Sequence, residues 1–379
     1  MKIGIFGGSF NPPHKGHQRL AAESAKAVGL DKVIIIPSCI PPHKSSGALV
    51  SAEDRLNMCR LAFDSPLFEV SSIELDRGNK SYTYDTLKQL KEIYPEDELY
   101  FIVGSDMLSS FRQWFRWEDI LSMCTLLASS REEGFLPDYS PYTDEQKQKI
   151  KFTDSSPFEI SSTQIRIRLK SNMPCDEFLD ERVTEYIRSH GLFDDEYDSY
   201  RIIMREMLDT QRLYHCECVS ESAGELAKLY GADVEKAKLA GLLHDITKRM
   251  PAEEQLSLMG EITPLEKNNY KVWHQMSAPV FLKEKDIITD EEILSAIRWH
   301  TTGKADMTLL QKIIYTADFI SADRSYPDVD TVRKLACFSL EHAMLYTCRY
   351  TVKDLVNHDR PVHPATLELY NDLLRHFGM

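Results

Sequence analysis

The sequence lacks several features that would each indicate a particular class of protein. Its eight cysteines form no CxxC pair, and only Cys216 and Cys218 lie close together, a pattern typical of reduced thiols rather than of a disulfide framework. No run approaches the roughly 18 apolar residues that a membrane-spanning helix needs. Glycines follow the first apolar residues too early for a signal-peptide core. We therefore expect a cytoplasmic protein with no membrane partner.

The sequence also lacks an excess of basic residues. Lys and Arg number 45 against 59 Asp and Glu, a formal charge of −14, so nucleic acid is not an expected partner. Residues 1–50 are the exception, because six basic and two acidic residues give them a local balance of +4. A basic segment in an acidic protein favours a pocket for a small anion.

Strand-like and helix-like segments alternate only in the first half of the 379 residues. The expected buried strands are the apolar runs 2–6, 32–36, 99–103 and 125–128, and a helix is expected over 17–28. From residue 200 onward the pattern predicts amphipathic helices instead, over 202–208, 219–230, 234–245 and 291–299. We expect a doubly wound α/β domain over 1–193, a solvated acidic linker over 194–199 and an all-α domain over 200–379.

A glycine-rich turn follows the first predicted strand. Gly7 and Gly8, continued by Ser9 and Phe10, let the main chain turn sharply and approach a ligand closely. Main-chain amides of such a turn form an anion site together with the start of the next helix. The HxGH tetrad at 14–17 places two histidines on one face of that first helical turn.

These residue types suit nucleotidyl transfer, in which the protein mainly positions the reactants and supplies hydrogen bonds or positive charge to the triphosphate. Four side chains near the turn meet that need: His14, Lys15, His17 and Lys44. A later segment, 160–166, adds hydroxyl groups and Arg166 for the β- and γ-phosphates, although by itself it equally fits a helix N-cap.

The segments GGSFNPPHKGH and ISSTQIR resemble the HxGH nucleotidyltransferase superfamily. Segments 41–44, 81–86 and 104–106, with Trp114, are similar to bacterial nicotinate-nucleotide adenylyltransferase, in that family's order over about residues 1–193. The resemblance implies a Rossmann-like fold and Mg²⁺-assisted transfer of AMP from ATP to nicotinate mononucleotide, giving deamido-NAD and pyrophosphate in NAD biosynthesis. It implies catalytic or nucleotide contacts at His14, His17, Lys44, Gly104, Asp106, Ser161, Ser162, Thr163 and Arg166, and nicotinate contacts at Thr83, Tyr84 and Trp114.

A second set of polar residues lies among apolar neighbours after residue 200, where eight of the twelve histidines occur. The set comprises His215, His244, Asp245, His274, His300 and Asp318. Buried imidazoles and carboxylates need partners, and a shared metal would serve all of them. Because neighbouring side chains on a helix diverge by about 100°, His244 and Asp245 can reach one ion only at a helix end or irregular turn, or else serve two ions.

The order of this set resembles the HD-domain metal phosphohydrolases, and its surroundings are similar to YqeK-type hydrolases, which split diadenosine tetraphosphate symmetrically into two ADP. The resemblance implies one or two iron or manganese ions held by those six residues, with Asp245 and Lys248 catalytic and with Lys248 and Arg324 neutralising the polyphosphate. His274 and His300 would complete a second ion or contact a substrate phosphate. The sequence departs from the pattern at Ser277, where Gly is expected, and at Ser321, where an acidic residue is expected.

Several alternatives stay open. The first half could use another mononucleotide or phosphopantetheine, and the second half a guanosine polyphosphate or a nucleoside monophosphate. The second half could also be a metal- or nucleotide-sensing module without catalysis. The sequence does not predict an oligomeric state, and a homo-oligomer stays open.

Overall fold

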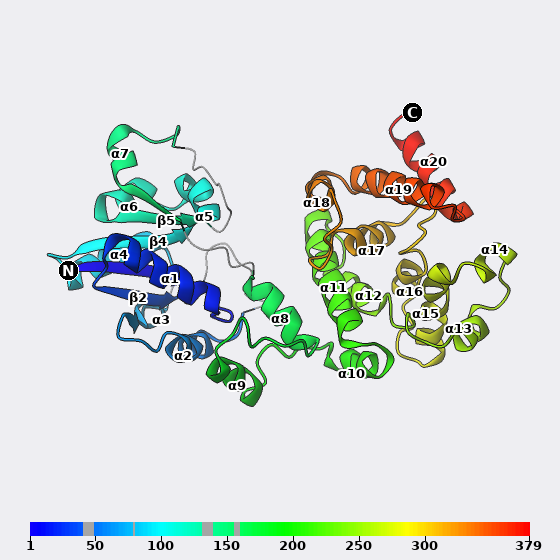
Figure 1. Cartoon of the computed structure of the whole chain (residues 1–379), viewed down its shortest axis with the longest axis horizontal. Coiled ribbons are helices and arrows are strands. Elements are labelled where there is room, and N and C mark those ends of the chain that lie inside the picture. The colour runs from blue at the N-terminus through cyan, green and yellow to red at the C-terminus, as the bar shows by residue number, and fades with distance from the viewer. Residues whose placement is uncertain (41–48, 79, 131–138, 155–159) are drawn as a thin grey trace. The chain divides into compact units, whose positions relative to one another are not determined.

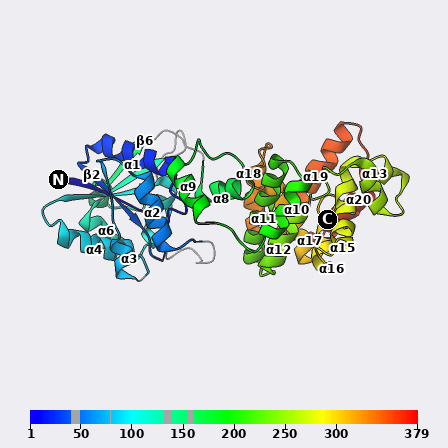
Figure 2. The same cartoon turned by 90° about the horizontal axis from the view of Figure 1, so that it is seen from below.

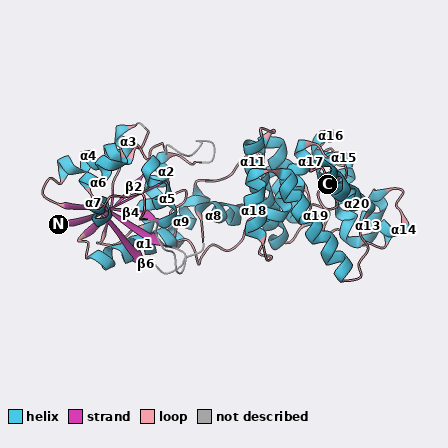
Figure 3. Cartoon of the chain, turned by 90° about the horizontal axis from the view of Figure 1, so that it is seen from above, coloured by secondary structure: helices cyan, strands magenta, loops and turns pink. Residues whose placement is uncertain are grey.

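The computed structural model describes residues 1–40, 49–78, 80–130, 139–154 and 160–379 (Figure 1). It divides into two units, Met1–Leu169 with Pro174–Phe193, and Lys170–Met173 with Asp194–Met379. Among the described residues, strands occur only in the first unit (Figure 3). Within the same ranges, no helix combines the length and the apolar character that crossing a membrane would require.

A six-stranded parallel sheet forms the centre of the first unit, in the order β3-β2-β1-β4-β5-β6, which confirms the doubly wound fold. Its strands are β1 (Lys2–Gly8), β2 (Lys32–Pro37), β3 (Phe68–Val70), β4 (Glu98–Gly104), β5 (Thr125–Ser130) and β6 (Ile150–Asp154). The order reverses between β1 and β4, and open α/β sheets bind ligands at the carboxyl ends of the strands beside such a reversal. Gly7 and Gly8 end β1 and Gly104 ends β4, so the predicted glycines meet at this point.

Helices cover both faces of the sheet (Figure 2). Side chains of a strand alternate between faces, so Val33 and Ile35 of β2 belong to one core and Ile34 and Ile36 to the other. The first core contains residues of α1 (Lys15–Val28), α2 (Ala52–Ala62) and α9 (Glu181–Ser189). The second contains residues of α3 (Ile73–Arg77), α4 (Thr83–Ile93), α5 (Ser105–Ser110) and α6 (Trp117–Met123). Burial on both faces explains why this strand is a continuous apolar run.

The second unit is helical, as its periodicity predicts. Its helices are α10 (Asp198–Met207), α11 (Thr210–Tyr230), α12 (Val234–Leu243), α13 (Ala252–Met259), α14 (Pro264–Lys267), α15 (Trp273–Glu284), α16 (Glu291–Arg298), α17 (Leu309–Ile320), α18 (Val329–Phe338), α19 (Leu340–Asn357) and α20 (Pro364–His376). One hydrophobic core joins α11, α12, α15, α16 and α17, the helices that carry or adjoin the six predicted metal ligands.

The segment 194–199, predicted to be a solvated acidic linker, forms ion pairs and part of a helix in the structure. Helix α10 already begins within it, and Asp195 forms ion pairs with Lys170 and Arg201. The side chain of Arg201 is buried and also binds Glu217 of α11. A buried guanidinium requires counter-charges. The acidic residues therefore supply ion pairs in this segment.

The contact between α11 and α12 depends on Gly241. A Cβ atom there would lie 2.9 Å from Ser220 Cα and 3.1 Å from the Val219 carbonyl oxygen, which are main-chain atoms. We expect Gly241→Ala to lower the free energy of unfolding by about 1–3 kcal/mol, because this overpacking outweighs the better helix propensity of Ala. Urea denaturation of the full chain measures the change.

Gly224→Ala is the matched control on α11. A Cβ atom at Gly224 would meet only the side chain of Lys238, which is flexible and can move away. We expect this variant to be as stable as the unmodified chain, and an equal loss of stability in both variants would contradict the interpretation of Gly241.

Candidate functional site

A cavity of about 450 Å³ lies at the carboxyl end of the sheet. Gly7, Gly8 and Ser9 line one side of it, at the end of β1. Thr83, the first residue of α4, and Trp114 line it as well. The structure therefore brings the predicted glycine turn and two predicted nicotinate contacts, all far apart in the sequence, to a single cavity.

Trp114 is half-buried and belongs both to the cavity wall and to the apolar core. Its ring meets the Phe101 ring edge-on with centroids 6.1 Å apart, and the Phe111 ring at 5.4 Å. The third predicted nicotinate contact, Tyr84, does not belong to the cavity lining. The Arg116 guanidinium covers the Tyr84 ring, 4.0 Å from its centroid.

Glu74 also lines the cavity, although the sequence analysis did not single it out. The Thr86 hydroxyl donates a hydrogen bond to Glu74 Oε1 at 2.6 Å. Burial raises the pKa of Glu74, against the opposing effect of hydrogen bonds from Ser81 and Thr86. A glutamate near the start of a short helix gives no sequence signal that it faces a cavity.

The two histidines of the HxGH tetrad lie at the start of α1. The main-chain N–H of His14 donates to Nδ1 of His17 at 3.1 Å, and the ring centroids are 3.6 Å apart. Because Nδ1 of His17 accepts this bond, the neutral ring carries its hydrogen on Nε2 and can donate to a phosphate oxygen. Lys15 differs from the prediction, because its Nζ donates to the Asp176 carbonyl oxygen at 2.6 Å.

The second predicted phosphate segment contacts this turn directly. It forms the first turns of α8 (Ser162–Lys170). Ser162 Oγ donates to the Pro12 carbonyl oxygen at 3.0 Å, and Arg166 Nη1 donates to the Asn11 carbonyl oxygen at 2.9 Å. Arg166 Nη2 also donates to Thr163 Oγ1 at 3.1 Å. The HxGH and ISSTQIR segments therefore build one surface.

Ser161 caps the start of helix α8, which is the alternative role that the sequence analysis left open for segment 160–166. Its hydroxyl accepts from the Gln164 N–H at 3.2 Å, and Gln164 Oε1 accepts from the Ser161 N–H at 2.9 Å, which together form a capping box. Two further predicted residues are not described, because Lys44 lies outside the described residues, as does the side chain of Asp106.

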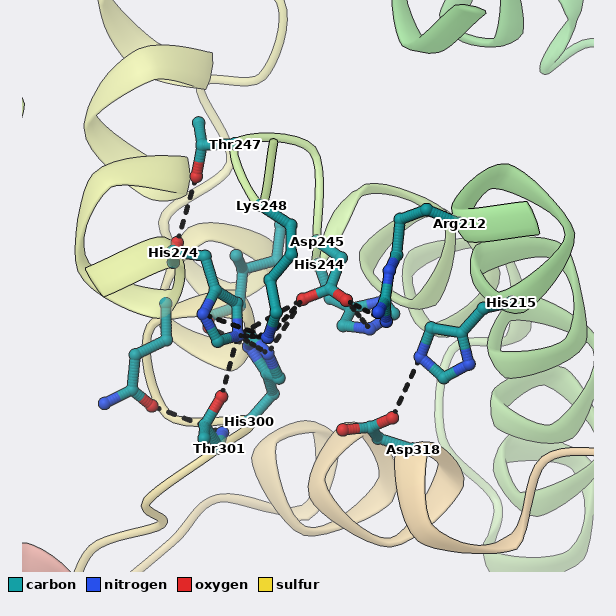
Figure 4. A network of polar contacts seen from close by, with 12 residues as sticks. Arg212, His215, His244, Asp245, Thr247, Lys248, His274, His300, Thr301 and Asp318 are labelled. Atoms are coloured by element: carbon teal, nitrogen blue, oxygen red, sulfur yellow. Dashed lines mark hydrogen bonds and ion pairs between the residues drawn. The ribbon is translucent and has the colours of Figure 1, made fainter. Parts of the chain in front are cut away.

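The six predicted polar residues of the second unit meet in one buried cluster (Figure 4). They come from α11 (His215), the turn after α12 (His244, Asp245), the first turn of α15 (His274), the turn after α16 (His300) and α17 (Asp318). The ligand atoms of His215, His244 and Asp318 lie within 4.8 Å of one another, as do those of His244, Asp245 and His300. The adjacent pair His244 and Asp245 follows a helix end, as its geometry requires.

Hydrogen bonds determine which nitrogen of each histidine is available. Nδ1 of His244 lies 2.7 Å from the Gly241 carbonyl oxygen, and Nδ1 of His300 lies 2.7 Å from the Ile297 carbonyl oxygen. A carbonyl oxygen only accepts, so each Nδ1 carries the hydrogen and each Nε2 keeps its lone pair in the neutral ring. This is the tautomer that a metal ligand needs.

The charge state of the cluster also fits a cation. Burial lowers the pKa of His244 to about 4, so this ring is neutral at pH 7. Burial opposes ionisation of Asp245, but His244, His274 and Lys248 hold the pKa of Asp245 well below its usual range. His244 Nε2 and Asp245 Oδ1 are buried and accept no hydrogen bond from any residue that the structure describes. A neutral imidazole and an ionised carboxylate with unsatisfied acceptor atoms are donors for a divalent metal ion. Burial opposes protonation of His215, but hydrogen bonds to Asp318 and Asp323 raise the pKa of His215 to about 9, so this ring must lose a proton when it binds the ion.

His274 belongs to the cluster but has a different hydrogen-bond pattern. Lys248 Nζ lies 3.1 Å from its Nδ1 and 2.9 Å from its Nε2, while His300 Nε2 lies 3.0 Å from that Nε2. Because an ammonium group only donates, Lys248 donates to a ring nitrogen of His274, and that nitrogen carries a lone pair. His274 thus differs from His244 and His300 in having a lysine as a partner of its ring nitrogens.

Three contacts of the cluster were missed by the sequence analysis. Arg212 Nη1 lies 3.0 Å from Asp245 Oδ2, Asp323 Oδ2 lies 2.8 Å from His215 Nδ1, and Thr301 Oγ1 lies 3.1 Å from His274 Nε2. Arg212 precedes His215 by three residues on α11, so helical spacing could have revealed it. Asp323 and Thr301 are distant in the sequence from the histidines that they contact, so only the tertiary fold brings them together.

Comparison with known proteins identifies a protein family for each of the two units. Residues 5–168 match the family described as cytidylyltransferase-like, and residues 212–323 match the HD domain. The chain is 38% identical over 194 residues to nicotinate-nucleotide adenylyltransferase of Bacillus subtilis (strain 168), which covers 51% of this chain and 98% of that protein.

A further relative extends over both units. The chain is 28% identical over 369 residues to the "Probable nicotinate-nucleotide adenylyltransferase/Ap4A hydrolase" of Mycoplasma genitalium, covering 94% of this chain and 99% of that protein. A solved structure of a "predicted HD superfamily hydrolase involved in NAD metabolism" from Clostridium acetobutylicum is 34% identical, covers 48% of this chain and 98% of that one, and has a TM-score of 0.47. Through its first half the chain belongs to the nicotinate-nucleotide adenylyltransferase family, and its second half contains an HD domain.

Proposed function

We propose that this chain is a bifunctional enzyme of NAD biosynthesis and dinucleotide hydrolysis. Its first unit transfers AMP from ATP to nicotinate mononucleotide, giving deamido-NAD and pyrophosphate. Its second unit hydrolyses diadenosine tetraphosphate symmetrically to two ADP. The observation that carries the first activity is the cavity shared by the glycine turn, Thr83 and Trp114. The buried histidine and aspartate cluster carries the second, and the name of the Mycoplasma relative supports its substrate.

In the transferase reaction, the phosphate of nicotinate mononucleotide attacks the α-phosphate of the substrate MgATP, and pyrophosphate leaves. The attacking phosphate is already ionised, so the protein mainly has to align the reactants and stabilise charge. The Nε2–H group of His17 and the start of α1 donate to the triphosphate. Arg166 and Ser162 hold the main chain of that turn in place.

The other end of the cavity holds the pyridine ring of nicotinate mononucleotide. Trp114 offers an aromatic face to the electron-poor heterocycle. The main-chain N–H groups at the start of α4, beside Thr83, are donors for its carboxylate.

In the hydrolase unit, a bound divalent ion supplies Lewis acidity and lowers the pKa of a water molecule towards neutrality. His215, His244, Asp245, His300 and Asp318 would hold it, and the mixed imidazole and carboxylate donors suit iron or manganese. Three cations border the same carboxylates: Arg212 and Lys248 near Asp245, and Arg324 near Asp318. These side chains neutralise the polyphosphate, and His274 completes a second ion or contacts a substrate phosphate.

An activity panel on the full chain tests both proposals. ATP is paired with nicotinate mononucleotide or nicotinamide mononucleotide, and diadenosine tetraphosphate is compared with guanosine polyphosphates and nucleoside monophosphates. Deamido-NAD from the first set and two ADP from the second support the proposal. Formation of ATP and AMP from the dinucleotide would contradict symmetric cleavage. A bound ion without turnover of any of these nucleotides would indicate a sensing module.

Trp114→Ala tests the pyridine site. Loss of an aromatic stacking partner costs about 1–3 kcal/mol, so we expect the KM for nicotinate mononucleotide to rise about 5- to 150-fold while the KM for ATP is unchanged. Trp114→Phe should keep most of the affinity. Trp117→Ala is the matched control, because Trp117 packs beside Phe111 in the same core but does not line the cavity. Equal effects of the two alanine variants would show that Trp114 acts only in packing.

A further inference from the structure

His215 differs from the other two histidines of the candidate ligand groups in its place in the fold. His244 and His300 follow helix ends, where each Nδ1–H reaches a main-chain carbonyl oxygen three residues earlier. His215 is the sixth residue of α11, where the carbonyl groups accept the hydrogen bonds of the helix itself. Its Nδ1–H group therefore needs an acceptor from another element.

Asp323 supplies that acceptor. Its Oδ2 lies 2.8 Å from Nδ1 of His215, while Asp318 Oδ1 lies 3.1 Å from Nε2 on the ligand side of the same ring. The other carboxylate oxygen of Asp323 accepts from the Ser321 hydroxyl at 2.7 Å. The side chain of Asp323 is only 15% exposed. The turn that follows α17 thus holds a half-buried carboxylate behind His215.

We propose that Asp323 is a positioning residue for the metal site of the second unit. It keeps the hydrogen of His215 on Nδ1, directs Nε2 towards the ion and, through its negative charge, makes Nε2 a stronger donor. The resemblance to HD-domain proteins predicts an acidic residue at position 321, where this chain has Ser321. Asp323, two positions later, supplies the carboxylate instead, and the Ser321 hydroxyl orients it. The inference rests on the proposed function only in requiring a divalent ion at this cluster.

The test is Mn²⁺ binding to the metal-free full chain, with free Mn²⁺ measured by electron paramagnetic resonance. We expect Asp323→Ala to raise the Kd for Mn²⁺ about 10- to 100-fold, which is the usual effect of losing the partner of a metal ligand. Asp323→Asn should have a smaller effect, because its amide oxygen still accepts from Nδ1–H but carries no charge. Asp330→Ala is the matched control, since Asp330 is exposed and pairs with Arg333.

The outcomes separate this inference from the proposed function. If the unmodified chain binds no Mn²⁺, the metal site is wrong and the role of Asp323 with it. If it binds Mn²⁺ and Asp323→Ala binds equally well, only the role of Asp323 is overturned. Should the alanine variant fail to fold, Asp323→Asn and Ser321→Ala decide, and unchanged Kd values in both would overturn the proposal. A ¹⁵N shift of His215 Nδ1 in the asparagine variant, with adenylyl transfer unchanged, would support it.

Discussion

Asp245→Ala is expected to abolish hydrolysis of diadenosine tetraphosphate while leaving adenylyl transfer unchanged. Asp245 is buried, ionised and within 3.6 Å of His244, His274, His300, Lys248 and Arg212. Loss of a residue that only supports a metal ligand lowers metal affinity or activity by up to about 100-fold. Asp245→Ala removes a proposed ligand itself, so the rate of hydrolysis should fall by more than this. Removing one charge also leaves the neighbouring cations uncompensated. Hydrolysis rates at saturating metal, together with bound metal per chain, measure the effect.

The interpretation of Asp245 depends on two controls. Asp245→Asn preserves the shape of the side chain but not its charge, and should lose most of the hydrolysis as well. Asp330→Ala, an exposed carboxylate of the same unit, should hydrolyse normally. Full hydrolysis by folded Asp245→Ala would refute the proposed site. Loss of both activities in a folded protein would refute the independence of the two sites.

His17→Ala should have the opposite effect and abolish adenylyl transfer alone. Removing one oriented donor from a charged transition state costs about 10²–10³ in kcat. The His14 N–H group fixes the His17 ring so that Nε2 carries the donated hydrogen, and truncation removes both the acceptor and the donor. Steady-state kinetics with ATP and nicotinate mononucleotide should show the loss mainly in kcat.

His17→Asn is the informative companion variant, because an amide can accept from the His14 N–H group and still offer an N–H donor. It should recover part of the rate. His190→Ala provides the matched control, as His190 is exposed and stacks on Tyr186 at 4.0 Å in the same unit. A loss confined to the KM for nicotinate mononucleotide would contradict the assigned role of His17.

The fold could be predicted where burial leaves a clear pattern. The apolar run at 32–36 predicts a buried parallel strand, and β2 indeed pairs in parallel with β1 and buries residues 33–36. The edge strands β3 and β6 were missed, since the first has three residues and the second alternates apolar and polar side chains. The ion pairs of the acidic segment 194–199 could not be predicted, because composition cannot show which carboxylates a buried arginine binds.

The candidate sites could be predicted in their residue types but not in every role. The resemblance to known families identified the six residues of the metal cluster, and the structure brings them together. The structure adds side-chain directions that the sequence did not predict: Lys15 reaches the Asp176 carbonyl, Tyr84 lies under Arg116, and Lys248 contacts the ring nitrogens of His274. Such directions depend on partners that only the tertiary structure supplies.

The division of the chain into units has a consequence for how the two enzymes can be separated. An end-to-end fusion needs one crossing between its parts, whereas this chain crosses three times, because Lys170–Met173 belongs to the second unit. A hydrolase piece that starts at residue 194 would lack Lys170. The ammonium group of Lys170 pairs with Asp195, and its carbonyl oxygen accepts a hydrogen bond from Arg205. The two units are thus interleaved along the sequence, and a hydrolase expressed from residue 194 would keep Arg201 but lose Lys170 as a cationic partner of Asp195.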